Sequence, residues 1–168
     1  MNTILYTPWQ IEDVVDGIAT HLNNLYDQHN EDKVVFAPIL QGAVPFFSDI
    51  SRNLLFNPYV DYLGVSSYEG QEQTEFNLYK APDRAIIKDR TVWLFDDIAD
   101  SGNTLQFTKN VLLSMGAKEV KTCVLLKKSH CTYPVDLYGF PMNDEWVWGY
   151  GMDAPDGRGR LLNAIFCK

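Results

Sequence analysis

The sequence lacks long apolar runs, paired cysteines and an excess of basic residues. No stretch approaches the roughly eighteen apolar residues of a membrane-spanning helix, so no membrane is expected as a partner. Three cysteines, Cys123, Cys131 and Cys167, stand far apart without a C-x-x-C pair, which argues against a zinc site or a disulfide framework. The first ten residues carry neither the charged region nor the cleavage site of a signal peptide. We therefore expect a cytoplasmic protein.

Positive charge is also scarce, with 14 lysines and arginines against 22 aspartates and glutamates and a formal net charge of -8. Binding to nucleic acid irrespective of sequence depends on basic side chains that neutralise phosphates. The composition therefore argues against nucleic acid as a partner. A small phosphorylated ligand stays compatible with it, because backbone N–H groups and a divalent cation can hold phosphate.

What the sequence does contain is enough apolar residues for one core. Its 168 residues are 46% apolar and 13% aromatic, and they show no repeat or interior linker, so a single domain over residues 1–168 is expected. Strands and helices alternate, which predicts an open, mostly parallel α/β sheet. The pattern predicts helices at 8–27, 44–55 and about 103–115, strands at 33–40, 60–67, 91–95 and 121–127, and later strand-like segments at 135–140, 145–151 and 161–166.

Two polar signals refine this outline. Residues 7–10, Thr-Pro-Trp-Gln, form a capping box with proline at the first helical position. Residues 68–76 are polar and show no periodic pattern, which predicts an exposed and mobile loop. Residues 77–81 are then predicted to be the far side of a hairpin.

An acidic segment follows the buried strand at 91–95. The apolar run stops at Asp96, and Asp97 and Asp100 come directly after it. In parallel α/β sheets, ligands bind outside the carboxyl ends of the strands. These carboxylates are therefore expected on one strand-to-helix loop that faces a cleft, where ribose hydroxyls or a magnesium shell are chemically sensible partners.

Small and polar residues lead from this segment into the next helix, where N–H groups lack partners within the helix. Glycine permits a close approach of the backbone, and the hydroxyl groups add donors, so this stretch is suited to phosphate. A simpler interpretation makes it a helix cap beside solvated aspartates. That interpretation does not explain the two further carboxylates, so we favour a phosphate site at Ser101, Gly102, Asn103 and Thr104.

A hydrophobic strand, two acidic residues, two apolar residues and D-[ST]-G-x-T together resemble the phosphoribosyl-diphosphate motif of type I phosphoribosyltransferases. Residues 34–52, 60–70 and 135–153 resemble, in order, the pyrophosphate loop, the strand into the flexible catalytic loop and the base-binding segment of the hypoxanthine-guanine branch. The resemblance implies a type I phosphoribosyltransferase fold, an α/β fold with a mostly parallel central sheet flanked by helices and a small base-binding hood.

The activity implied by this resemblance is transfer of the phosphoribosyl group from 5-phosphoribosyl 1-diphosphate to a hypoxanthine- or guanine-like purine base. The products are a nucleoside 5'-monophosphate and pyrophosphate, as in purine salvage. The implied cofactor is Mg2+, the partners are these small-molecule substrates, and a homo-oligomer, dimer or tetramer, is expected. The alternatives are the same reaction on another base, or a non-catalytic regulator that senses nucleotides or binds RNA.

Family roles can be carried onto matching positions of the phosphate-binding half. Asp96 and Asp97 would contact the ribose hydroxyls, directly or through water on magnesium, and Asp100 would be the general base or acid. Residues 101–104 would hold the 5-phosphate. Gln41 and Gly42 stand in the pyrophosphate loop, where the family usually has Lys-Gly and a non-proline cis peptide bond, so an unusual backbone is expected at residues 40–42.

The remaining implied roles belong to the base and the diphosphate. Trp146 would stack on the base, Val147 would offer backbone groups to its edge, and Asp153 would help to hold a second magnesium ion. An arginine would touch pyrophosphate, for which we favour Arg160 over Arg158. Ser67 and Tyr68 would stand in the flexible loop, and residues 68–76 would close over the reaction.

One departure bears on the base itself. In our alignment the lysine that hydrogen-bonds the 6-oxo group of the base falls on Pro134, which has no side-chain donor. Lys127 or Lys128 could replace it, although exposed positions at the end of a strand are favoured for both. This predicts a weak preference for hypoxanthine and guanine. His21, His29 and His130 show no ligand spacing and are expected on the surface or in helices.

Overall fold

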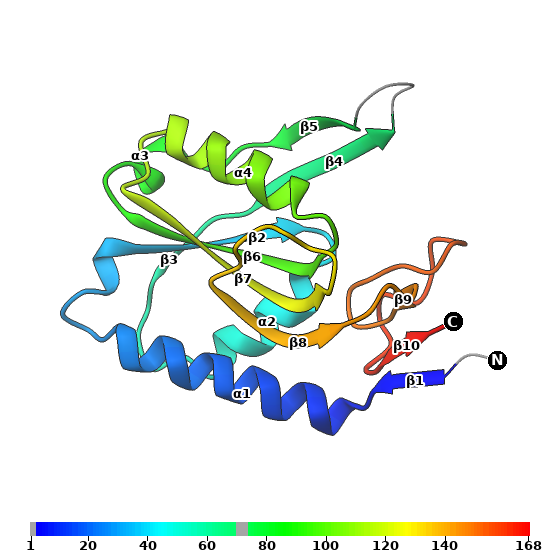
Figure 1. Cartoon of the computed structure of the whole chain (residues 1–168). Coiled ribbons are helices and arrows are strands. Elements are labelled where there is room, and N and C mark those ends of the chain that lie inside the picture. The colour runs from blue at the N-terminus through cyan, green and yellow to red at the C-terminus, as the bar shows by residue number, and fades with distance from the viewer. Residues whose placement is uncertain (1–2, 70–73) are drawn as a thin grey trace.

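The computed structural model describes residues 3–69 and 74–168, so part of the predicted loop, residues 70–73, lies outside the described residues. Two sheets carry the described strands, a large one that runs through the body of the molecule and a small one beside both termini (Figure 1). None of the helices in the described part is long and apolar enough to cross a membrane.

The helices are α1 (Pro8–Leu25), α2 (Val44–Arg52), α3 (Arg84–Ile87) and α4 (Asn103–Ser114), with a 3-10 turn at Glu31–Lys33. The strands are β1 (Thr3–Tyr6), β2 (Val34–Leu40), β3 (Tyr59–Val60), β4 (Leu63–Glu69), β5 (Thr74–Lys80), β6 (Thr91–Ala99), β7 (Glu119–Lys128), β8 (Leu137–Met142), β9 (Val147–Trp148) and β10 (Ile165–Cys167).

The large sheet has the order β5-β4-β2-β6-β7-β8, with β3 also paired to β2. Among the described strands of this sheet, β5 alone runs antiparallel to its neighbour, and the other pairs are parallel. Helices α1 and α2 lie on one face of this sheet and α3 and α4 on the other (Figure 1). The predicted α/β architecture with a mostly parallel sheet is therefore confirmed.

Both faces of the sheet are buried, which explains the nearly continuous apolar sequence of the central strands. Phe36 and Phe95 point toward α1 and α2, whereas Val35 and Leu94 point toward α3 and α4. All four side chains are fully buried. Because the central strands run parallel, their carboxyl ends lie at the same end of the sheet, where the acidic segment also lies.

Helices α1, α2 and α4 begin as predicted but end earlier, whereas the short helix α3 was not predicted. Thr7 and Gln10 form both hydrogen bonds of the capping box at the start of α1. Helix α1 ends at Leu25 and α2 at Arg52, where the sequence pattern predicted about 27 and 55. Tertiary hydrogen bonds explain the second difference, because Asn23 of α1 accepts from the N–H of Leu55 and donates to the carbonyl of Asn53.

A polar hairpin replaces most of the predicted loop at 68–76. Tyr68 pairs with Glu75 and Ser67 with Phe76, so backbone pairing extends β4 and β5 on both sides of residues 70–73. The ring of Phe76 stacks on Phe107 of α4 with centroids 5.1 Å apart. A sequence with no amphipathic pattern can form strands when backbone hydrogen bonds and one such contact hold it. The predicted return strand at 77–81 is confirmed as part of β5.

The small sheet is the predicted hood. It has the order β1-β10-β9, with antiparallel pairs that place Thr3 beside Cys167 and Phe166 beside Trp148. The sequence analysis assigned no strand to residues 3–6, because four residues show little periodicity and their partner lies at the other end of the chain. The hood stands beside the ends of β6, β7 and β8 (Figure 1).

Candidate active site

Two adjoining pockets lie where the carboxyl ends of the central strands meet the hood. The larger, the acidic pocket, has a volume of about 380 Å3. It collects most of the residues that the sequence analysis assigned to the phosphoribosyl-diphosphate site. Those that line it are Gln41, Gly42, Ser67, Asp96, Asp97, Asp100, Ser101, Gly102, Thr104, Asp153 and Arg160.

The smaller pocket, the Lys128 pocket, has a volume of about 170 Å3. It contains both predicted base-binding residues, Trp146 and Val147. Three of the aspartates of the acidic pocket line it as well, so the two pockets form one continuous site. Its lining residues are Asp97, Ile98, Asp100, Lys128, Trp146, Val147, Met152 and Asp153.

The acidic segment differs from its predicted form in one respect. Asp96 and Asp97 were expected on the loop with Asp100, but β6 continues through both of them to Ala99. The neighbouring strand causes this, because β7 pairs with β6 as far as the contact between Ala99 and Lys127. A rigid strand therefore positions the two carboxylates, and the loop proper begins at Asp100.

The predicted phosphate loop enters α4 through a left-handed glycine. Gly102 has a φ of 87°, and a Cβ at this position would lie 2.2 Å from the Cβ of Tyr133, so only glycine fits. Ser101 accepts a hydrogen bond from the N–H of Asn103 and thereby also caps the turn. Tyr68, which was predicted in the flexible loop, belongs to β4, and its side chain lies outside the described part. Asn103 is the predicted loop residue that does not line the acidic pocket.

Gly42 brings the predicted pyrophosphate loop against the acidic strand. A Cβ on Gly42 would lie 1.9 Å from the Oδ2 atom of Asp97, so this carboxylate packs directly on the glycine backbone. The peptide bond between Leu40 and Gln41 is cis, which confirms the expectation for this turn. Gln41 itself is exposed to solvent at the mouth of the pocket.

The adjacent carboxylates of Asp96 and Asp97 disfavour the loss of both protons. Burial, followed by the charge of Asp97, raises the pKa of Asp96 well above its ordinary value. Burial likewise raises the pKa of Asp97, against hydrogen bonds to Asp96 and to the N–H of Ile98. A divalent cation beside the pair would favour full ionisation, so the donor chemistry fits Mg2+.

This pair would bind a cation only together with other ligands. In the part of the chain that the structure describes, no three His, Cys, Asp or Glu side chains gather to form a complete metal site. Mg2+ commonly uses one or two carboxylates and completes its shell with water and substrate phosphates. Asp153, the other predicted metal ligand, instead forms an ion pair with Arg160, in which the Nη2 and Oδ2 atoms lie 2.9 Å apart.

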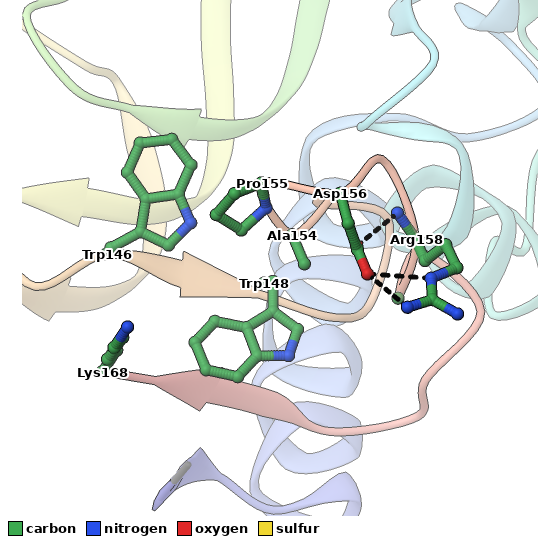
Figure 2. A pocket seen from close by; sticks show the side chains of 8 residues that line it. Trp146, Trp148, Ala154, Pro155, Asp156, Arg158 and Lys168 are labelled. Carbon is green, nitrogen blue, oxygen red and sulfur yellow. Dashed lines mark hydrogen bonds and ion pairs between the residues drawn. The ribbon is translucent and has the colours of Figure 1, made fainter. Parts of the chain in front are cut away.

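The two candidate arginines face different pockets. Arg160 lines the acidic pocket and donates to the carbonyl of Gly151 at 2.6 Å. Arg158 is paired with Asp156 and lines a separate outer pocket of about 500 Å3, together with Trp146 and Trp148 (Figure 2). The structure thus places Arg160, the residue favoured from the sequence, at the site of interest.

The position of Lys128 differs from the one expected from the sequence. Only 9% of Lys128 is exposed, although an exposed strand end was expected. Strand β7 continues through it and pairs with Met142 of β8, which brings the ammonium group into the Lys128 pocket. Pro134 lies exposed in the connection after β7 and lines neither pocket, and Lys127 lies over the ring of Tyr138.

Two side chains, Lys128 and His130, contact the carboxylate of Asp100. Lys128 donates to its Oδ2 atom at 2.9 Å, and His130 lies 2.7 Å from its Oδ1 atom. Burial by itself would raise the pKa of Asp100, but the hydrogen bonds from Lys128 and His130 outweigh it and lower that pKa. His130 is a surface residue, as predicted, but it takes part in the site, which its spacing in the sequence did not reveal.

Ile98 and Met152 are further lining residues that the sequence analysis missed. Both follow aspartates or glycines in segments that were identified by their polar residues, so an apolar member attracted no attention. Trp146, which also lines the Lys128 pocket, is 57% exposed. A small pocket that combines apolar side chains, one exposed aromatic ring and a few charged groups is suited to a planar ring with polar edges.

Comparisons with known proteins agree with this geometry. The family model of the phosphoribosyl transferase domain matches residues 7–155. The chain is 30% identical to hypoxanthine-guanine-xanthine phosphoribosyltransferase of Tritrichomonas foetus, over 91% of this chain and 84% of that protein. It is also 30% identical to hypoxanthine phosphoribosyltransferase of Escherichia coli, over 86% and 83% of the two chains.

A solved structure extends the similarity to the fold. Hypoxanthine-guanine phosphoribosyltransferase of Bacillus anthracis has a TM-score of 0.88 to this chain at 28% identity, and the match covers 98% of this chain and 97% of that one. The family predicted from the acidic segment is thereby confirmed. The chain belongs to the type I phosphoribosyltransferases and is similar to their hypoxanthine-guanine branch.

Proposed function

We propose that this protein transfers the phosphoribosyl group of 5-phosphoribosyl 1-diphosphate to hypoxanthine or guanine, in purine salvage. One observation carries the proposal. Asp100 lies at the junction of an acidic pocket with a phosphate loop and a smaller pocket with an aromatic ring and a buried lysine. A proton acceptor at that junction stands where a base and a ribose would meet.

The acidic pocket would hold 5-phosphoribosyl 1-diphosphate. The backbone of residues 101–104 is suited to the 5-phosphate, because the first turn of α4 offers N–H groups and a positive dipole end. Asp96 and Asp97 would accept hydrogen bonds from the ribose hydroxyls. The diphosphate would lie against Gly42 and Arg160, with Gln41 as a neutral donor in place of the family's usual lysine.

The proposed cofactor is Mg2+, which Asp96 and Asp97 would hold, and Asp153 would help to hold a second Mg2+ ion. When bound, the ion would neutralise charge on the diphosphate and stabilise it as a leaving group. The raised pKa values of the two strand carboxyls support this assignment, since a cation is the partner that lets both ionise. Asp153 would have to share its carboxylate with Arg160.

The Lys128 pocket would hold the base. Trp146 and Ile98 line it and can cover the two faces of a purine, while the backbone at Val147 can read its edge. Lys128 would donate to the 6-oxo group, a role that the sequence alignment had left without a donor at Pro134. A base without that oxo group would leave the ammonium unpaired, which favours 6-oxopurines over 6-aminopurines.

The reaction requires one bond to form as another breaks. A ring nitrogen of the base attacks the anomeric carbon, the bond from that carbon to the diphosphate oxygen breaks, and positive charge develops on the ribose. Asp100 would take the proton from the imidazole ring of the base and so prevent positive charge on the purine. The walls of both pockets would hold the reactants in line and exclude water.

The test is pyrophosphate release from 5-phosphoribosyl 1-diphosphate and Mg2+ with hypoxanthine, guanine, xanthine and adenine. We expect efficient turnover of the 6-oxopurines. Lys128→Met should lower kcat/KM for hypoxanthine by about tenfold to a hundredfold, the order of one lost charged hydrogen bond, and leave adenine little changed.

Two variants serve as controls for this experiment. Lys127→Met removes a neighbouring lysine outside the pocket, and Pro134→Lys adds the lysine that the sequence alignment called for; both should behave like wild type. A wild type that releases no pyrophosphate with any of the bases would overturn the proposed function. If Pro134→Lys alone increased guanine turnover, position 134, and not Lys128, would be the one that contacts the 6-oxo group.

We also propose an oligomeric state and a location in the cell. A dimer or tetramer is proposed for the chain in solution, and analytical ultracentrifugation would test it. A cytoplasmic location is proposed because all three cysteines are free thiols, of which two are buried, as suits a reducing compartment. A different base and a non-catalytic role are the less favoured alternatives, since Lys128 and Asp100 both face the pocket.

A further inference from the structure

His130 connects two carboxylates from different parts of the chain. Its Nε2 atom lies 2.7 Å from Oδ1 of Asp100, on the loop after β6. Its Nδ1 atom lies 2.5 Å from Oδ1 of Asp144, between β8 and β9. Two residues after Asp144 comes Trp146, so the imidazole ring joins the acidic loop to the segment that carries the aromatic side of the pocket.

The two oxygens of Asp100 have separate partners. Oδ2 accepts from Lys128 and Oδ1 contacts His130. If Lys128 turns to the 6-oxo group of a bound base, Oδ2 loses its partner and becomes free to accept a proton. The contact to His130 does not depend on this change, because it uses the other oxygen. Lys128 can therefore contact the substrate while His130 keeps its contact with Asp100.

The side chain of Asp100 requires a contact that fixes its orientation. Its side chain is 56% exposed, so packing alone does not restrict its rotamer, and it follows the last residue of β6. General-base catalysis requires the acceptor within hydrogen-bond distance of the proton it takes, and small displacements slow the reaction strongly. A fixed contact on the oxygen that does not react would orient the other.

We propose that His130 is a positioning residue, which holds Asp100 by Oδ1 while Oδ2 takes the proton of the base, and that Asp144 orients the imidazole. This inference rests on the proposed function. His130 touches neither the base nor the ribose in this scheme and acts through Asp100 alone. Lys128 then has two states, one on Asp100 in the free enzyme and one on the base.

Charge supports this arrangement. Hydrogen bonds to Asp144 and then to Asp100 raise the pKa of His130, so the ring is charged over a wider pH range than a free imidazole. With a proton on each nitrogen, the ring donates to both carboxylates at once. The charged groups around it are Asp100, Asp144 and, across Asp100, Lys128.

Three substitutions at this position test the proposal. His130→Ala removes both contacts. His130→Gln keeps a donor near the place of Nε2, which faces Asp100, whereas His130→Asn keeps one near the place of Nδ1, which faces Asp144. His21→Ala, an exposed histidine on α1, is the control. The readouts are kcat and KM for each substrate, and urea unfolding of each variant checks that it folds.

We expect His130→Ala to lower kcat by about tenfold, the order for one charge-assisted hydrogen bond, with KM for 5-phosphoribosyl 1-diphosphate unchanged. His130→Gln should recover most of kcat and His130→Asn little of it. Unchanged kcat in His130→Ala would overturn the proposal, as would recovery by Asn and not by Gln, which would make the residue an anchor for Asp144. A wild type without turnover would instead overturn the proposed function, and this role with it.

Discussion

At the scale of single residues, the site is a set of carboxylates that differ in their surroundings. Asp96 and Asp97 are close to each other and partly or fully buried, and both have raised pKa values. Asp100, three residues later, has a lowered pKa because Lys128 and His130 outweigh its burial. Aspartate is thus suited to binding a cation and ribose at positions 96 and 97, and to proton transfer at position 100.

Asp100→Asn tests the second of these roles. Asparagine keeps the shape of the side chain and loses its basicity, so we expect kcat to fall by about 10² to 10⁴-fold, with much less effect on KM for 5-phosphoribosyl 1-diphosphate. Steady-state pyrophosphate release measures both. Asp156→Asn, which alters a carboxylate of the outer pocket, is the matched control. Near wild-type turnover in Asp100→Asn would reduce Asp100 to a structural role.

At the scale of elements, the site depends on how closely the hood approaches the pyrophosphate loop. Gly151, in the turn after β9, has a φ of 103°, and a Cβ there would lie 2.0 Å from the carbonyl oxygen of Gly42. Arg160 spans the same turn, donating to the carbonyl of Gly151 while it pairs with Asp153. The hood and the end of β2 therefore form two walls of one pocket.

Gly151→Ala should separate these walls. The added methyl group collides with backbone at Gly42, so we expect KM for 5-phosphoribosyl 1-diphosphate to rise by about tenfold or more, since positioning of the substrate is lost. Gly157→Ala is the control, because Gly157 also has a positive φ, 77°, yet a Cβ there meets nothing within 4 Å. Equal effects of both changes on KM would show that backbone strain, and not the collision, is responsible.

At the scale of the whole molecule, one sheet with a core on each face carries the site at its edge. The face toward α1 and α2 is rich in aromatic residues, and Phe36 lies among Phe47, Phe56 and Phe95 with ring centroids 5.0 to 6.3 Å apart. Strand β2, which contains Phe36, leads directly to the cis bond and the pyrophosphate loop. The core therefore supports the geometry of the site.

Phe36→Ala should lower the free energy of unfolding by about 3–5 kcal/mol, through lost burial and the cavity that remains. Urea denaturation monitored by circular dichroism measures it. Trp9→Ala, at a position that is 76% exposed, should change the stability by no more than about 0.5 kcal/mol. A loss of less than about 1 kcal/mol in Phe36→Ala would mean that the core repacks around the missing ring.

Local chemistry made the family predictable from the sequence. The acidic strand end, the glycine before α4 and the capping box at Thr7 each act over a few residues, so their meaning does not depend on distant partners. The apolar strands at 34–40 and 91–95 likewise indicated a sheet buried on both faces. The phosphate loop and the acidic pair followed from such short-range patterns, whereas Arg160 was chosen over Arg158 only from the family resemblance.

Tertiary structure alone decided what depends on distant contacts. Pairing of β7 with β8 carries Lys128 into the pocket and leaves Pro134 outside it, and pairing of β6 with β7 keeps Asp96 and Asp97 on a strand. In the hood, residues 3–6 pair with residues 165–167, which lie at the other end of the chain. His130 lies 30 residues from Asp100 and 14 from Asp144. The spacing within one chain carries no signal for such contacts, because the register between strands, and not the residues themselves, brings them together.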